Sequence, residues 1–171
     1  MRKIFIWIIS IFFLTGCSNI ISRSSSDNRE ELYRDLYENW QLEELKSRLE
    51  QNSAAGENPM IIKYRKLVIE REKDKEKLET LIDEIKADLA DGDSTRLQKS
   101  LNFSLKNVFA GNEIEKIDFS RIKVLTGRPK FFKNKASNMT AFVIEDRTIY
   151  FDVKFLLEKG DWKITEFKER R

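Results

Sequence analysis

The chain of 171 residues contains no histidine, one cysteine, two prolines and six glycines. Without histidine it lacks the commonest general base and the imidazole ligands of a zinc site, and it cannot form a Ser-His-Asp triad. A single cysteine excludes an intramolecular disulfide. The sequence also has no glycine-rich loop of the kind that holds phosphate. We therefore expect a protein that is not an enzyme and that has no cofactor and no metal site.

The N-terminus has the three parts of a secretory signal. Arg2 and Lys3 give it a basic start, and the run from Ile4 to Leu14 is apolar except for Ser10. This run is shorter than the roughly 20 residues that a membrane-spanning helix needs. The ending Leu14-Thr15-Gly16-Cys17 resembles the lipobox of bacterial lipoproteins, a family in which the cysteine is acylated and the chain is cut just before it.

The resemblance implies a signal peptide over 1–16 and a mature chain that begins with a lipidated Cys17. Such a protein is anchored outside the cytoplasm, in the outer membrane of a diderm cell or otherwise on the outer face of the cell membrane. Residues 17–28 are rich in serine and predict a flexible tether. Two of the 32 basic residues lie in the signal, so 30 Lys and Arg oppose 29 Asp and Glu in the mature chain. A nearly neutral chain does not indicate nucleic-acid binding.

The first half of the mature chain has helical periodicity. Apolar residues at three- and four-residue steps predict helix over 29–51, with a phase change at Asn39-Trp40 that indicates two short helices or one kinked helix. Pro59 is expected in the first turn of a helix over 60–73. The alternating charges of 71–77 are either a solvated helical face or a bridge between domains, and an amphipathic helix over 78–89 follows.

A further helix is expected after Gly92, whose position favours a left-handed helix end. It carries Leu97, Leu101, Leu105 and Val108. The period then changes to two, which predicts strands over 117–124, 139–144, 148–157 and 162–167, with a hairpin turn at 158–161. In the last strand, simple alternation places Trp162, Ile164 and Glu166 on one face and Lys163, Thr165 and Phe167 on the other.

This order of elements predicts an α+β fold in which N-terminal helices precede a curved antiparallel sheet of about four strands packed on helices. The turn Asp91-Gly-Asp-Ser-Thr-Arg-Leu97 and the segment Tyr150-Phe-Asp-Val-Lys-Phe-Leu-Leu-Glu-Lys-Gly-Asp-Trp-Lys-Ile-Thr165 are similar to the nuclear-transport-factor-2-like superfamily, in the form common in small bacterial lipoproteins of unknown function. The resemblance implies a cone-like domain over 74–171, preceded by a helical hairpin module over 29–73.

Enzymes of that superfamily use a pocket aspartate, and Asp152 lies in mid-strand on the same side as Tyr150. If this side lined the cone, the two residues would be candidates for a pocket. The sequence favours the other interpretation, in which Asp152 points outward and pairs with Lys154 or with a lysine across the sheet such as Lys163. A buried carboxylate needs a partner or a raised pKa, and no matched second group is evident.

Cations and aromatics mix in one segment that is a candidate ligand or partner surface: Arg128, Lys130, Phe131, Phe132, Lys133 and Lys135. Outside the cytoplasm its ligand would be an anionic headgroup or polymer rather than nucleic acid. The plainer interpretation is a solvated loop with Phe131 and Phe132 beneath it.

Asp88, Asp91 and Asp93 suggest calcium, but a helix end and cap explain them better, because they lack the twelve-residue calcium-loop pattern.

The sequence thus predicts a membrane-anchored envelope lipoprotein that binds a partner protein or a small apolar ligand without catalysis. A small hydrolase, isomerase or dehydratase with a pocket carboxylate is one alternative. A structural component that self-assembles is another, which an exposed apolar patch on 32–49 or 61–68 would support.

Overall fold

The computed structural model describes residues 28–52, 58–108 and 118–170. The predicted signal, Cys17, the predicted tether up to residue 27 and Ile117 lie outside these ranges. Asn28, which the sequence assigned to the tether, is already helical. The chain divides into two compact units, Met1–Arg65 and Lys66–Arg171.

Three helical segments form the described part of the first unit: residues 28–38, α2 (Leu42–Gln51) and the start of α3 (Pro59–Ala90). The chain turns between the first two at Trp40, whose φ is 58°. Of the two alternatives that the sequence left open, the structure has two short helices. Pro59 is the first residue of α3, as its missing N–H favours.

Two tyrosines hold the segments of the first unit together. The rings of Tyr33 and Tyr64 meet edge to face with centroids 5.5 Å apart. The side-chain amide of Asn52 donates to the Tyr33 hydroxyl at 3.0 Å, and Lys63 pairs with Glu30 at 2.9 Å. The buried aliphatic side chains around them recur with helical spacing: Leu36, Leu42, Leu45, Leu49 and Ile61.

Helix α3 is one continuous element of 32 residues, so the charge run 71–77 is helical. The helix ends as predicted, with a left-handed residue after it. Gly92 has a φ of 82°, a conformation that costs glycine little. The N-cap residue of the next helix is Ser94, which makes no side-chain cap hydrogen bond, and the carboxylate of Asp93 before it accepts the backbone N–H of Thr95 at 2.8 Å.

The single helix expected after Gly92 is in fact two: α4 (Thr95–Ser100) and α5 (Phe103–Val108). Leu101 between them is extended and forms a parallel bridge with Ile164. The N–H of Asn102 donates to the Ile164 carbonyl at 2.9 Å. Pairing with the sheet therefore overrides the helical spacing of Leu97, Leu101 and Leu105.

A short 3-10 turn, η2 (Phe119–Arg121), precedes a sheet of five antiparallel strands. The strands are β1 (Lys123–Thr126), β2 (Lys130–Phe132), β3 (Lys135–Ile144), β4 (Arg147–Glu158) and β5 (Asp161–Glu169). Strand β3 pairs with β4 on one side and with both β1 and β2 on the other, and β4 also pairs with β5. The α+β fold class is confirmed, with one strand more than expected because β2 lies in the segment that the sequence favoured as a loop.

The hairpin at 158–161 is also as predicted. Lys159 and Gly160 both have positive φ, at 54° and 88°, the pattern of a two-residue turn whose twist suits the strands.

The predicted faces of β5 are wrong beyond Ile164. Phe155 pairs with Ile164 but Lys154 pairs with Glu166, so Thr165 is the extra residue of a β-bulge. Phe167 then pairs with Val153 and shares the face of Ile164, while Glu166 points to the opposite face. A bulge exchanges the two faces of everything that follows it, and simple alternation cannot anticipate it.

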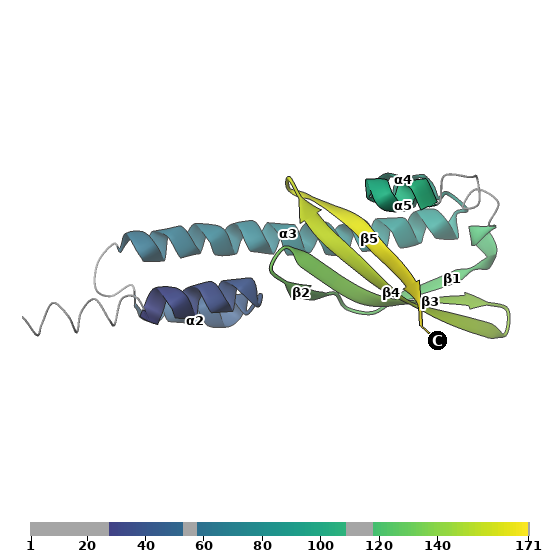
Figure 1. Ribbon diagram of the computed structural model, residues 1–171. Coiled ribbons are helices and arrows are strands. Elements are labelled where there is room, and N and C mark those ends of the chain that lie inside the picture. Colours follow the sequence, from purple (N-terminus) through teal and green to yellow (C-terminus); the bar gives the residue numbers. More distant parts are fainter. Residues whose placement is uncertain (1–27, 53–57, 109–117, 171) are drawn as a thin grey trace, which may run out of the picture. The chain divides into compact units, whose positions relative to one another are not determined.

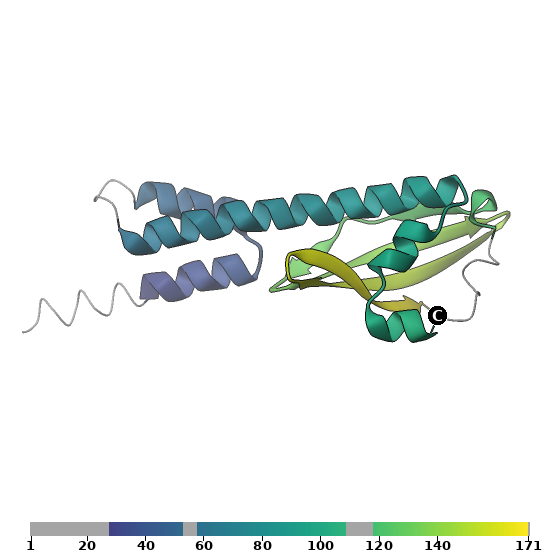
Figure 2. The same cartoon turned by 90° about the horizontal axis from the view of Figure 1, so that it is seen from above.

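Figures 1 and 2 show the second half of α3 running along one face of the sheet, with α4 and α5 beside β5. This inner face is defined by the sheet residues that line the space beneath α3: Val124, Thr126, Asn138, Thr140, Phe142, Val153, Phe155, Ile164 and Phe167. Trp162 joins the two layers, because it is buried and its indole N–H donates to the Asp74 carbonyl in α3 at 2.7 Å.

Replacing Trp162 with Phe should lower the free energy of unfolding by about 1–3 kcal/mol, since the Asp74 carbonyl loses its donor and the ring shrinks. Urea unfolding of the wild-type and variant chains measures the difference. Tyr150→Phe, on a half-exposed ring of the same sheet, is the control and should change the stability by less than about 0.5 kcal/mol. Equal effects of both substitutions would contradict a structural role for the indole N–H.

Candidate functional site

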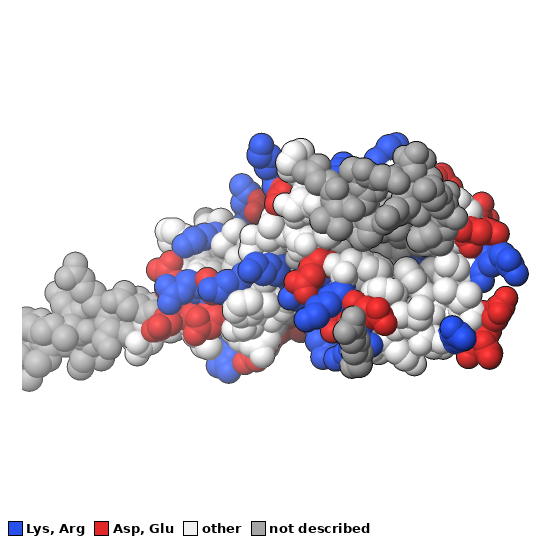
Figure 3. Space-filling view, turned by 45° about the vertical axis from the view of Figure 1, so that its right-hand side comes forward, with Lys and Arg blue, Asp and Glu red and all other residues white. Residues whose placement is uncertain are grey.

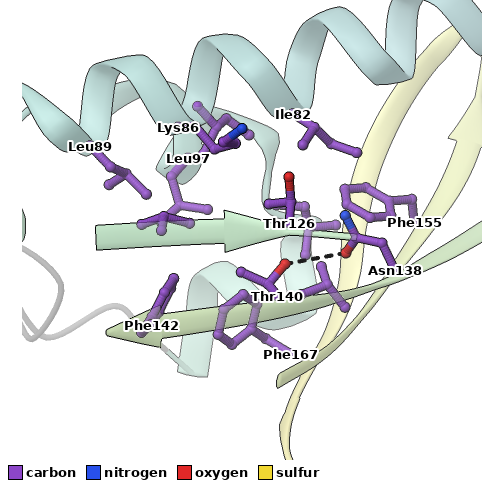
Figure 4. Close-up of a pocket in the computed structure, with 14 residues that line it drawn as sticks. Ile82, Lys86, Leu89, Leu97, Thr126, Asn138, Thr140, Phe142, Phe155 and Phe167 are labelled. Carbon is purple, nitrogen blue, oxygen red and sulfur yellow. Dashed lines mark hydrogen bonds between the residues drawn. The ribbon is translucent and has the colours of Figure 1, made fainter. Parts of the chain in front are cut away.

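The space between α3 and the inner face of the sheet is the inner cavity (Figure 4). Ile82 and Leu89 of α3 and Leu97 of α4 close it from one side, and Phe142 and Phe155 lie on the sheet side. Its polar groups include two buried ones on β3: the Thr140 hydroxyl donates to the side-chain carbonyl of Asn138 at 3.3 Å.

The inner cavity has a volume of about 40 Å³. Sites for small molecules are typically about 300–1,000 Å³, whereas a single water takes up about 30 Å³. The inner cavity therefore has room for a water beside Asn138 and Thr140, and its apolar lining is the core of the unit. Its size does not support the expectation of a small apolar ligand inside the domain.

The opposite, outer face of the sheet carries a larger hollow, the basic groove, of about 710 Å³. It lies where the edge of the sheet is interrupted between β1 and β2, and its floor is β3. The N–H of Gly127 still donates to the Met139 carbonyl at 2.7 Å. A Cβ on Gly127 would stand 3.4 Å from that carbonyl oxygen, at the lower limit of ordinary van der Waals contact. The charged residues that line the groove are Arg128, Lys130, Asp152, Lys154, Glu166, Lys168 and Arg170.

Two ion pairs neutralise part of this charge. Lys154 lies 2.7 Å from Glu166, and Arg170 lies 3.5 Å from Asp152. Within the described residues no ion pair is formed by Arg128, Lys130 or Lys168. The groove thus has five cations against two carboxylates, and the three unpaired cations are those available to a ligand.

A second hollow, the apolar groove of about 310 Å³, adjoins the basic groove and shares Gly127 and Met139 with it. Leu125, Met139 and Tyr150 are exposed there to 47%, 43% and 44%. On the face shown in Figure 3, Lys and Arg side chains are interspersed with Asp and Glu side chains and border a wide uncharged area.

The structure separates the residues of the predicted basic and aromatic surface. Arg128 and Lys130 line the basic groove. Phe131 turns to the inner side, where its ring lies 6.0 Å from that of Trp162. Phe132 is half exposed, with the Lys133 ammonium 5.5 Å from its ring centroid, and Lys135 is exposed opposite Leu156 on β4. Alternation along β2 causes the separation, since the segment is a strand and not a loop.

Asp152 points outward, into the basic groove, and its side chain is 45% exposed. Its ionic partner is Arg170 rather than Lys154 or Lys163. Tyr150, the other pocket candidate, lines the apolar groove. The two residues therefore share the outer face of the sheet, and neither enters the inner cavity.

The groove residues that the sequence missed are Lys154, Glu166, Lys168 and Arg170. They come from β4, β5 and the segment after β5. Because they are not adjacent in the sequence, no basic or acidic run indicates that they form one groove. The alternation of Asp152 and Lys154 was a visible signal for one side of the groove. On the other side, the bulge at Thr165 changes the face of Glu166 and Lys168, so simple alternation did not place them in the groove.

Two of the three aspartates that suggested calcium have other partners. Asp88 accepts a hydrogen bond from Arg96 at 2.7 Å, and hydrogen bonds from Thr95 lower the pKa of Asp93. In the part of the chain that the structure describes, no group of three or more Cys, Asp and Glu side chains is arranged to hold a metal ion.

No helix among the described residues combines the length and the apolar character that crossing a bilayer requires.

No family model matches the chain, and no curated protein or solved structure is significantly similar to it. The resemblances to lipoproteins and to the nuclear-transport-factor-2-like superfamily therefore stay predictions.

Asp152→Asn should change the free energy of unfolding by less than about 1 kcal/mol, because a half-exposed ion pair at 3.5 Å contributes little. Urea unfolding at neutral pH measures this. Thr140→Val, which alters the buried pair on the inner face, is the comparison and should cost about 1–2 kcal/mol. A change above about 2 kcal/mol for Asp152→Asn would mean that this carboxylate is held in a buried site.

The carboxyl group of Asp74 leads to a prediction of how the stability of the protein depends on pH. Burial raises the pKa of its carboxyl, against the opposing effect of Lys77 and Arg71. The folded protein thus disfavours the charged form, which lowers stability at neutral pH, and this penalty disappears as the pH falls through the raised pKa. Asp74→Asn should therefore stabilise the protein at pH 7, and the difference should shrink towards about pH 4. A stabilisation that is the same at both pH values would contradict the assignment.

Proposed function

We propose that this protein is a lipoprotein of a bacterial cell envelope that is anchored by an acylated Cys17 and that acts, without catalysis, by binding a partner protein. The anchor is supported by Leu14-Thr15-Gly16-Cys17 at the end of the apolar run. Acyl chains contribute roughly 0.8 kcal/mol of membrane affinity per buried CH₂, and two or more of them make an anchor stable. The folded units are then outside the cytoplasm, at the outer membrane if the cell is diderm.

The observation that carries the binding part is the outer face of the sheet, where unpaired cations adjoin exposed apolar side chains. The basic groove has a volume of about 710 Å³ and the adjoining apolar groove one of about 310 Å³. The inner cavity, at about 40 Å³, gives little support to a small apolar ligand. This distinction favours a partner protein over the other ligand class that the sequence left open.

The position of Asp152 supports a non-catalytic role. A general acid or base of the resembled superfamily would be expected in a secluded pocket, where burial adjusts its pKa. Asp152 instead lies in an open groove and pairs with Arg170. The order of helices before an antiparallel sheet is compatible with that superfamily, and we keep this membership as part of the proposal.

A self-assembling role has one observation in its favour. Leu32 and Ile62 in the first unit are exposed to 37% and 51%. Most other apolar side chains of 32–49 and 61–68 are buried in the unit or partly covered, so the apolar surface available to a second copy is small.

Cys17→Ser should abolish incorporation of a radiolabelled fatty acid and leave the signal uncut by the lipoprotein peptidase, because the thiol is the acceptor. Metabolic labelling and the mass of the purified chain are the measurements. A matched variant carries both Cys17→Ser and Ser24→Cys, which returns a thiol to the chain away from the lipobox, and it should also remain unlabelled. Label on the Cys17→Ser protein would refute the anchor.

A further inference from the structure

The basic groove exists because the edge of the sheet is broken. Strands β1 and β2 both pair with β3, but Gly127, Arg128 and Pro129 between them form no ladder with it beyond the one bond from Gly127 to Met139. Pro129 has no N–H to contribute. The interruption leaves Asn138 and Met139 of β3 without a ladder partner on that side, Met139 is exposed there, and Arg128 and Lys130 lie on that flank of the groove.

The other flank comes from the far side of the sheet. Asp152 and Lys154 on β4 and Glu166 and Lys168 on β5 all point to the outer face, and Arg170 follows β5. The two carboxylates are held by Lys154 and Arg170. The unpaired cations therefore lie on both flanks, with Arg128 and Lys130 on one and Lys168 on the other, and ion pairs lie in the groove with them.

This arrangement suits a polypeptide better than a bilayer. An anionic membrane presents a broad field of one sign, which attracts the cations but repels Asp152 and Glu166, and a bilayer surface does not enter a hollow between strands. A polypeptide can place carboxylates against the three unpaired cations and backbone N–H groups against the two carboxylates. Complementarity in both signs is what gives protein interfaces their specificity.

The apolar groove adds a second requirement. Leu125, Met139 and Tyr150 surround Ala141, which is itself buried although it is on the outer face. A ligand that continues from the basic groove across Met139 would cover these three side chains, which favours a partner with an apolar side chain close to its acidic ones.

From this geometry we infer that the outer face of the sheet binds a segment of a partner protein that carries Asp or Glu side chains in the basic groove and an apolar side chain in the apolar groove. The inference rests on the proposed function, which it deepens by defining the surface and the chemistry of the partner. An acidic partner segment accounts for the unpaired cations and the exposed apolar side chains together.

The test uses the full acylated protein in a nonionic detergent and a fluorescent peptide of about ten residues, long enough to span several strands, that combines Glu, Leu and Ser. A second peptide has Gln in place of every Glu. The groove variant carries Arg128→Gln, Lys130→Gln and Lys168→Gln. The control variant carries Lys99→Gln, Lys106→Gln and Lys159→Gln, three exposed cations of the same unit outside the groove.

Wild type and the control variant should bind the Glu peptide about tenfold more tightly than the groove variant does, in a fluorescence anisotropy titration, because each lost ion pair weakens binding a few-fold. The Gln peptide should bind wild type as weakly as the Glu peptide binds the groove variant. Equal losses for both variants, or equal affinity of wild type for both peptides, would overturn the inference.

A measurement in cells addresses the real partner. A photoreactive phenylalanine analogue in place of Tyr150 should crosslink to a protein, and the groove substitutions should abolish this crosslink. The same analogue in place of Phe103, which is 80% exposed on α5, should not give that crosslink. A Tyr150 crosslink that survives the groove substitutions counts against the inference.

Vesicles of phosphatidylglycerol give the competing outcome. If a chain with Cys17→Ser and residues 1–16 deleted bound them through the groove while the Glu peptide failed to bind wild type, the groove would recognise a lipid surface and the inference would be wrong. The anchor is tested separately by the labelling of Cys17. A failure of the groove and a failure of the proposed localisation are therefore distinguishable.

Discussion

The antiparallel pairing of β3 with β4, over ten residues of each strand, is the constraint on which the second unit depends. It fixes which side chains of both strands share a face. Phe142, Val153 and Phe155 consequently meet α3, while Met139, Asp152 and Lys154 face outward. A slip of one residue would exchange these sets and expose the core, so the buried face itself enforces the register. The same register creates the outer grooves, which makes them a consequence of how the core is packed.

Much of this architecture could be predicted from local patterns. The helical spacing, the break at Trp40, the left-handed Gly92 and the turn at Lys159-Gly160 all depend on residues close in sequence, and the structure has each of them. The predictions that were wrong concern backbone positions that are set by residues distant in the sequence. Leu101 leaves its helix to bridge Ile164, and the bulge at Thr165 turns Phe167 inward. Neither event has a local sequence signal, because each is set by a strand partner that becomes adjacent only after folding.

The residues of the candidate site were likewise predicted only where they are adjacent in the sequence. Arg128 and Lys130 were evident as part of a basic segment, but Phe131 in that segment belongs to the inner side of the sheet. The rest of the groove is assembled from β4, β5 and Arg170. Asp152, considered first as a possible acid, instead forms part of an ion-paired surface. The inner cavity is a small space lined by core side chains, whereas the outer face is accessible and carries three cations that form no ion pair within the described residues.

The interrupted edge that β1 and β2 form has a consequence for aggregation on that side of the sheet. A long, regular edge strand offers a row of free N–H and C=O groups to any similar strand, and such edges promote aggregation. Here the edge is divided into pieces of four and three residues by Gly127, Arg128 and Pro129, and lysines begin both pieces. Another chain could align with only a few bonds before meeting the proline and the charges. Under the proposed membrane anchor, copies of the protein would diffuse in two dimensions, and an edge of this kind would disfavour strand pairing between neighbouring molecules.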